Sequence, residues 1–597
     1  MSAVKPTWKH SRYGFAAFFF ASIVIALTVL RLVIFAKFAG PSEPTIADTA
    51  QTFLIGLHQD IVVALFTTLP LLFWFWIVRE RAFGKRWHSV LLTLGMFLFW
   101  AVQVFLFFTE FYFFDEFRSR FNTVAVDYLL YPDEVVGNIR ESYPLFTIIG
   151  ICGVIALAWV LVAFWIFRGM WQQTIPSRSR FLRFAGATAL AVALSFTVKM
   201  NGTHFSKDRT LNEIANNGSI SFVDAAITRN LDYAANYRTL PRDEAYARVR
   251  TILASPKAEF IGDQHSILRK IAGDSTKPKL NVVLLLEEAL GSEFWGCLGR
   301  TNTLTPEMDK LATEEGLLFT NMYACGNRTV RGFEGVFSSF PPMPGDSIVK
   351  RDRSENVESI ARVLKRDGYT NVFLYGGRGL FDGMRKYALE NGWDRFIEQK
   401  DFDKPTFTTI WGVCDEDLYS RSIEEFRKLN ETGKPFFGTL LTVSNHKPYT
   451  YPRGRIADDP EKPKATRQKA VKYTDWALGQ FFKAAKKEAF WTNTIFIVVA
   501  DHGARVYGAQ EVPIFSYEIP LVILGPAVVK EPQRIGTLGN SLDVAPTVLG
   551  MLGRPYETIF FGRDLFNDPT EHTHALLNHN RSIGIFADAR MVILGLQ

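Results

Sequence analysis

The sequence predicts a polytopic α-helical membrane domain followed by an α/β domain with a largely parallel sheet. Apolar residues make up 48% of the 597 residues, and most of the excess of phenylalanine, at 52 residues, lies in the first 200 positions. Five apolar segments of membrane-spanning character occur before about residue 199. After about residue 280, strand-like and helix-like segments alternate, which is typical of an α/β domain.

The five expected spans also predict an orientation. Basic residues precede the first span and lie in the connections between the second and third spans and between the fourth and fifth, whereas residues 38–60 contain no Lys or Arg. Because cytoplasmic loops are enriched in basic residues, we expect a multi-pass protein of the inner (plasma) membrane with a cytoplasmic N-terminus and an extracytoplasmic second domain. The spans lie at about 14–36, 61–78, 89–109, 145–167 and 182–198, the last being marginal in length.

The predicted domain organisation has three parts: the membrane domain at 1–199, an extracytoplasmic linker at 200–279 and the α/β domain at 280–597. His58 and Asp60 begin the second span, and we expect water to solvate them, with a lipid headgroup contact as the alternative. The formal charge of +7 is not gathered into an aromatic-interleaved patch, so no nucleic-acid partner is expected. Four scattered cysteines are too few for a disulfide framework or a zinc site.

The elements of the second domain can be assigned in order. Thr494 to Ala500 is a run of β-branched and apolar residues, typical of a buried strand of a parallel sheet. Thr305, Pro306 and Gly316 mark the ends of one helix. The expected strands are 281–288, 371–377, 435–446 and 494–500, and the expected helices are 305–316, 356–368 and 465–486.

Ionisable residues follow several of these strands. Glu287, His446 and the pair Asp501-His502 fall at carboxyl ends, the edge where open α/β sheets place their ligands. Carboxylate oxygens and an imidazole nitrogen suit a divalent cation, so a metal-dependent active site is predicted there. Glu288 replaces Glu287 as the ligand if the strand register is shifted by one, because neighbours on a strand face opposite ways.

A candidate nucleophile lies between these strands. Thr329 opens a predicted helix in YACGNRTVRGFEG, where the positive helix end favours an anion. Beside a divalent metal, its hydroxyl could lose a proton and attack phosphorus. When the residue is taken alone, an ordinary helix cap explains Thr329 better than a nucleophile does.

Together these motifs resemble the sulfatase-like domain of the alkaline phosphatase superfamily. The motifs are LLLEE, NRTVRGFE, TVSNHKPY, ADHG and SLDVAPTVLGML, and five spans before such a domain resemble lipoteichoic acid synthases and phosphoglycerol transferases. The resemblance implies metal ligation by Glu287, Thr329, Asp501 and His502 and a substrate role for His446. It also implies a manganese-like ion, with Mg²⁺ or Zn²⁺ as alternatives, and a phospholipid donor.

The sequence departs from that family in three places. The Trp-Asn-Arg headgroup motif is replaced by Phe-Asp-Gly-Met-Arg, so Arg385 supplies the guanidinium one position later. Cys325-Gly326-Asn327-Arg328 lacks the proline and spacing of a sulfatase C-x-P-x-R motif, which disfavours sulfate ester hydrolysis. The chain also stops inside an apolar run at 591–597, where related domains usually continue, which raises the expectation of a truncated end.

The resulting hypothesis is a membrane-anchored transferase. Thr329 takes glycerol phosphate from phosphatidylglycerol in the lipid bilayer and passes it to a glycan or polymer acceptor outside the cytoplasm. His446, Arg385 and Arg328 are the candidate substrate-binding residues, and Arg328, like Arg331, is a weaker candidate because a solvated helix start explains it as well. The alternatives are a phosphoethanolamine transferase and a catalytically silent sulfatase-like module of the cell envelope.

Overall fold

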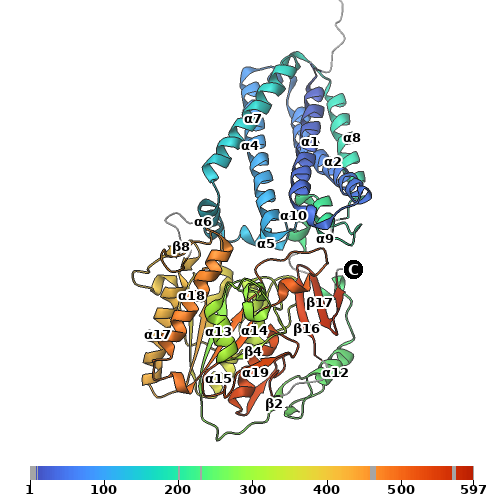
Figure 1. Cartoon of the computed structure of the whole chain (residues 1–597). Coiled ribbons are helices and arrows are strands. Elements are labelled where there is room, and N and C mark those ends of the chain that lie inside the picture. The colour runs from blue at the N-terminus through green and yellow to red at the C-terminus, as the bar shows by residue number, and fades with distance from the viewer. Residues whose placement is uncertain are drawn as a thin grey trace, which may run out of the picture. The chain divides into compact units, whose positions relative to one another are not determined.

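The chain forms two compact units in the computed structural model, which describes residues 9, 11–199, 202–228, 232–457, 465–567 and 573–595 (Figure 1). The first, which we call the membrane unit, comprises residues 1–130, 143–228 and 507–511. The second, the α/β unit, comprises residues 131–142, 229–506 and 512–597. Each unit therefore includes one short segment from the other's part of the chain.

Long apolar helices make up the membrane unit. Among the described residues, four are long and apolar enough to cross a membrane: α1 (Arg12–Phe38), α2 (Ile46–Ile77), α4 (Arg86–Phe117) and α7 (Leu145–Phe167). These helices make the chain an integral membrane protein. The fifth expected span forms α8 (Ser177–Ser195), whose first turns carry three arginines. Its crossing of the membrane therefore stays a prediction.

A buried ion pair joins two of these helices. Arg31 of α1 and Asp60 of α2 are 1% and 0% exposed, and their charged groups lie 2.7 Å apart. The expectation that water solvates Asp60 is wrong, because a carboxylate in an apolar helix needs a buried cation or donor instead. Asp60 also accepts a hydrogen bond from Asn217. The membrane unit thus extends beyond residue 199, through α9 (Arg209–Ala215) and α10 (Gly218–Ile227).

An eight-stranded mixed sheet forms the core of the α/β unit. Strands β11 (Thr494–Ala500), β3 (Asn281–Glu287) and β10 (Phe436–Leu441) are buried along their whole lengths and run parallel. These strands confirm the sequence prediction. The sheet order is β13-β4-β12-β11-β3-β10-β6-β7, with β12 antiparallel to both neighbours. The remaining strands are β4 (Leu317–Phe319), β6 (Thr370–Tyr375), β7 (Arg395–Ile397), β12 (Leu521–Leu524) and β13 (Gln533–Ile535).

The helices of this unit begin where local sequence provides a cap. Thr466 caps α18 (Arg467–Ala485), and Pro306 is the first residue of α13 (Pro306–Glu314). Asp475 of α18 accepts hydrogen bonds from the Glu307 and Met308 amides at 2.9 Å, so it caps α13 from outside. The other helices are α14 (Thr329–Ser338), α15 (Ile360–Arg366), α16 (Met384–Glu390), α17 (Asp415–Glu431) and α19 (Val544–Leu552).

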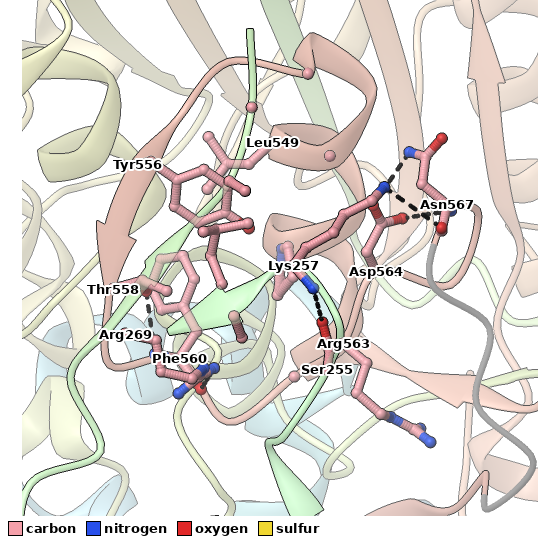
Figure 2. A pocket seen from close by; sticks show the side chains of 18 of the residues that line it. Ser255, Lys257, Arg269, Leu549, Tyr556, Thr558, Phe560, Arg563, Asp564 and Asn567 are labelled. Atoms are coloured by element: carbon pink, nitrogen blue, oxygen red, sulfur yellow. Dashed lines mark hydrogen bonds between the residues drawn. The ribbon is translucent and has the colours of Figure 1, made fainter. Parts of the chain in front are cut away.

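The rest of the predicted linker, described from residue 232 to residue 279, is part of the α/β unit. After α12 (Arg242–Ile252), it forms β1 (Ala258–Phe260) and β2 (Arg269–Ile271), and β2 pairs with β15 (Tyr556–Thr558). Residues from 252–277 and 546–567 line a cavity of about 300 Å³. Leu549, Tyr556 and Phe560 lie on one side of it, and Lys257, Asp564 and Asn567 lie on the other (Figure 2). The buried Arg269 guanidinium donates to the Phe560 carbonyl at 2.6 Å. These contacts attach residues 257–271 to residues 556–560 of the α/β unit.

Candidate functional site

Two neighbouring strands bring the candidate ligands together. Strands β3 and β11 are parallel, with Ala500 opposite Glu287, so both end at the same edge of the sheet. Glu288 follows β3 directly, and Asp501 and His502 follow β11. The Asp501 amide donates to the Glu287 carbonyl at 3.1 Å, which continues the strand pairing to the start of the site.

The carboxylate of Glu288 is the centre of this cluster. Its Oε2 accepts a hydrogen bond from Thr329 Oγ1 at 3.0 Å and lies 3.4 Å from His446 Nε2. Its Oε1 lies 3.6 Å from His502 Nε2, which is in turn 3.4 Å from Asp501 Oδ2. Ligand atoms of Glu288, Asp501 and His502 all fall within 4.8 Å of one another.

This donor set fits a divalent cation. Asp501 Oδ1 accepts hydrogen bonds from the Ala289 and His502 amides at 2.8 and 2.7 Å, which fix the carboxylate. Its other oxygen, Oδ2, is buried and has no hydrogen-bond partner among the described residues. A buried carboxylate oxygen without a partner is costly, and a cation would satisfy it. Two carboxylates and one imidazole are ligands that such ions accept.

The structure places Glu287 outside this cluster, although the sequence analysis expected it there. Its Oε1 accepts a hydrogen bond from the Tyr419 hydroxyl at 2.8 Å, and its Oε2 accepts one from Thr442 at 3.3 Å. Side chains of consecutive strand residues point to opposite faces, so only one of the two glutamates can face His502. Burial, followed by the charge of Asp415, raises the pKa of Glu287 to about 8.

Charge is unevenly distributed within the cluster. Burial and the adjacent Glu288 carboxylate raise the pKa of Asp501 well above its usual range. Burial also acts to raise the pKa of Glu288, but the His446 and His502 imidazoles and the Thr329 hydroxyl outweigh it and hold that pKa low. Burial lowers the pKa of His502. Both carboxylates would be ionised together only with additional positive charge nearby.

Thr329 is the first residue of α14, as the sequence predicts, and Arg328 is the preceding cap residue. Its hydroxyl therefore lies at the positive end of a helix and in contact with the cluster. Gly332, one turn later, makes this approach possible. A Cβ at Gly332 would lie 2.5 Å from the Asp501 carbonyl oxygen, so only glycine lets α14 pack this closely against Asp501.

His446 is held by a residue that the sequence analysis missed. Its ring stacks on Trp411 with a centroid distance of 4.2 Å and an interplanar angle of 16°. The Trp411 indole N–H donates to the Lys447 carbonyl at 2.8 Å, which fixes the indole beside residue 446. Trp411 lies in the turn between the short paired strands β8 (Thr408–Thr409) and β9 (Gly412–Val413), and no helical period or long apolar strand in the sequence singles it out.

The predicted phosphate-binding arginines differ in their surroundings. Arg328 lies 3.6 Å from Asp382 and is 22% exposed. Arg385 pairs with Glu398 at 2.9 Å, and none of its described contacts reaches the cluster. The buried Arg331 pairs with Glu334 at 2.6 Å, a structural contact inside α14. Contact of Arg328 and Arg385 with substrate stays a prediction.

Similarity to known proteins covers the α/β unit first. The family model described as Sulfatase matches residues 280–554. Lipoteichoic acid synthase 1 of Bacillus subtilis (strain 168) is 26% identical over 310 residues, which cover 45% of this chain and 47% of the relative. Phosphoglycerol transferase I of Xanthomonas axonopodis pv. citri is 28% identical over 210 residues, which cover 34% and 30%. The chain thus spans about half the length, or less, of these curated relatives.

Two solved structures extend the comparison. A crystal structure of a protein in the alkaline phosphatase superfamily from Vibrio parahaemolyticus is 37% identical, with a TM-score of 0.57, and the match covers 61% of this chain and 88% of that one. The integral membrane protein lipooligosaccharide phosphoethanolamine transferase A from Neisseria meningitidis is 16% identical, with a TM-score of 0.52, over 90% and 95%. The second likeness concerns the fold alone, membrane helices included.

Proposed function

Because the chain belongs to the alkaline phosphatase superfamily, we propose that it transfers glycerol phosphate from phosphatidylglycerol to an extracytoplasmic glycan or polymer. The observation that carries this proposal is the contact of Thr329 Oγ1 with Glu288 Oε2, 3.0 Å away, beside Asp501 and His502. A hydroxyl, two carboxylates and an imidazole form a complete set for phosphoryl transfer. That completeness argues against a silent envelope module.

Glu288, Asp501, His502 and Thr329 hold the proposed divalent ion, for which Mn²⁺ is the first candidate and Mg²⁺ or Zn²⁺ the alternatives. When bound, the ion supplies positive charge that favours the ionised threonine and stabilises the phosphoryl oxygens. The ligand set differs from the sequence hypothesis by one residue, since Glu288 takes the part expected of Glu287.

The proposed reaction has two displacements at phosphorus. In the first, Thr329 loses its hydroxyl proton to solvent water, its Oγ forms a bond to phosphorus, and the bond to diacylglycerol breaks. The diacylglycerol oxygen leaves with that electron pair and takes a proton from His446 Nε2, which lies beside Glu288. In the second, an acceptor hydroxyl attacks phosphorus and gives its proton to His446, and Thr329 Oγ leaves with the electron pair of its bond to phosphorus and takes a proton from solvent water.

The membrane helices support a lipid donor. Four candidate spans tether the α/β unit to the bilayer, so a water-insoluble donor need not leave the membrane to be used. The distribution of basic residues supports an extracytoplasmic α/β unit in the inner membrane. Reporter fusions at Lys207, in the membrane unit after α8, are expected to be active only outside the cytoplasm, and cytoplasmic activity would contradict the span count.

The proposal is tested by intact-mass analysis of the full chain in detergent after incubation with phosphatidylglycerol. A glycerol phosphate adduct that maps to Thr329 is expected, absent in Thr329→Ala and retained in part in Thr329→Ser. The matched control is Thr313→Ala, an exposed helical threonine that donates only to backbone carbonyls. An ethanolamine phosphate adduct, formed from phosphatidylethanolamine alone, would instead identify the alternative transferase. Lipid turnover that persists in Thr329→Ala would exclude the covalent mechanism.

A further inference from the structure

A row of four aromatic rings leads to the cluster from α6 (Pro132–Ser142). Tyr131, the residue before α6, lies 5.0 Å from Phe381 between ring centroids, and Phe381 lies 5.6 Å from Trp411. Trp411 stacks on His446, which contacts Glu288. The rings are thus in contact from the end of α6 to the candidate site, all within the α/β unit.

Helix α6 is fixed to this unit by specific contacts. Glu134 pairs with Arg378 at 3.3 Å, and Glu141 accepts a hydrogen bond from the Ile410 amide at 3.1 Å. Gly137 faces the Ile410 side chain so closely that a Cβ there would lie 2.4 Å from it. A side chain at residue 137 would therefore force the Ile410 side chain to shift, which shows that α6 packs closely against residue 410.

The outer end of the ring row carries exposed apolar side chains. Leu380, next to Phe381, is 81% exposed, and Val136 of α6 is 57% exposed. Large exposed aliphatic side chains that gather beside a site are typical of a surface that meets lipid or protein.

The connectivity of the chain favours lipid as the partner of these exposed side chains. Helix α6 ends at Ser142, and the candidate span α7 begins at Leu145. Three peptide units extend over about 10 Å at most, so the chain itself keeps the end of α6 within that distance of the first residue of a candidate span. Aliphatic side chains offer no hydrogen bonds to a sugar, whereas they lose unfavourable contact with water when acyl chains cover them.

We propose that Tyr131, Leu380 and Phe381 form an apolar lip over which the phospholipid donor reaches the site. The acyl chains of the lipid rest against these three residues. Its glycerol backbone passes along Phe381 and Trp411, and its phosphate group lies at His446. The inference rests on the proposed function for the donor's headgroup, and it adds the residues that select a membrane-embedded donor.

The test compares long-chain and short-chain phosphatidylglycerol as donors for the full chain in mixed micelles, with diacylglycerol release as the readout. Leu380→Ser and Tyr131→Ser are each expected to raise KM for the long-chain donor about tenfold, because apolar contact with the acyl chains is lost. The rate with dibutyryl phosphatidylglycerol should stay within twofold of wild type. Leu389→Ser, an exposed leucine on α16, is the matched control and should change neither.

Three kinetic results would overturn the lip. Equal losses with both donors would mean that these residues position the site without touching acyl chains. The absence of any loss would mean that they do not contribute to donor binding. A loss confined to acceptor-dependent turnover, with diacylglycerol release unchanged, would assign the surface to a glycan.

A second measurement does not depend on turnover. A benzophenone amino acid in place of Leu380 should cross-link to phospholipid when the full chain in lipid vesicles is illuminated, and the same group in place of Leu389 should not. Cross-linking without diacylglycerol release would reject the proposed function and keep the lip. Release without cross-linking would do the reverse.

Discussion

The two faces of the sheet at the end of β3 differ in the charge that they can hold. On one face, Glu287 is surrounded by the hydroxyls of Tyr419 and Thr442 and by the Asp415 carboxyl, and burial keeps it protonated near neutral pH. On the other face, Glu288 meets two imidazoles and the start of α14. Identical side chains at consecutive positions thus become a neutral core group and a charged ligand, and the neighbours decide which.

The largest effect is expected from replacing Glu288 by glutamine, compared with the same replacement at Glu287. Glu288→Gln removes a ligand charge from the cluster, so bound metal and turnover should fall, turnover by about a thousandfold or more. Glu287→Gln replaces a carboxyl that is already neutral, so bound metal should match wild type and turnover should stay within about tenfold. Elemental analysis measures the bound metal of each variant, and diacylglycerol release measures its turnover. If Glu287→Gln lost the metal and Glu288→Gln kept it, the assignment of the two faces would be reversed.

A smaller effect is expected when the helix beside Glu288 is moved. Gly332→Ala places a methyl group against Asp501, so α14 and the Thr329 hydroxyl must shift. Turnover should fall about a hundredfold, because displacements near 1 Å at a reacting group have effects of that size. Gly536→Ala is the control, since its added Cβ meets nothing within 4 Å. Equal activity of the two variants would show that α14 is not held at this distance.

Removing the ring behind His446 should cost less. Trp411→Leu abolishes the stacking contact and the hydrogen bond to Lys447, and turnover should fall about tenfold with bound metal unchanged. Trp411→Phe keeps an aromatic ring, so its turnover should lie between those of wild type and Trp411→Leu. A loss of metal in Trp411→Leu would instead mean that the indole supports the ligand side of the site.

The smallest effect concerns another buried acid, Asp475 of α18, which is not part of the cluster. Burial raises the pKa of Asp475 to about 7 from an unfolded value near 4, so folding favours its protonated form. Its contribution to the free energy of unfolding is therefore full below about pH 4 and is lost as the pH rises through about 7. Asp475→Asn should remove this dependence. Thermal midpoints from pH 4 to 8, with chelator present for both proteins, measure it, and parallel curves would refute the assignment.

The sequence predicted the positions of the strands better than the direction in which the residues at their ends point. Strands β3 and β11 are apolar at every position, which makes them easy to recognise but leaves no alternation to show which face a following residue takes. That is why the sequence pointed to Asp501, His502 and Thr329, which lie together in the candidate cluster, and gave Glu288 only as the alternative to Glu287. Trp411 and Gly332 act through close packing between distant segments, and such contacts have no local signal.

The docking of α6 has a consequence for synthesis of the chain. Glu134 pairs with Arg378, which lies 244 residues later, so α6 is made and delivered to the membrane long before its partner exists. At usual elongation rates this interval lasts roughly 10 to 50 s. During that time its contacts with Arg378 and Ile410 are unmade, and the apolar residues beside it are free to associate with lipid. Docking of α6 onto the α/β unit is therefore a late event in the biogenesis of the protein.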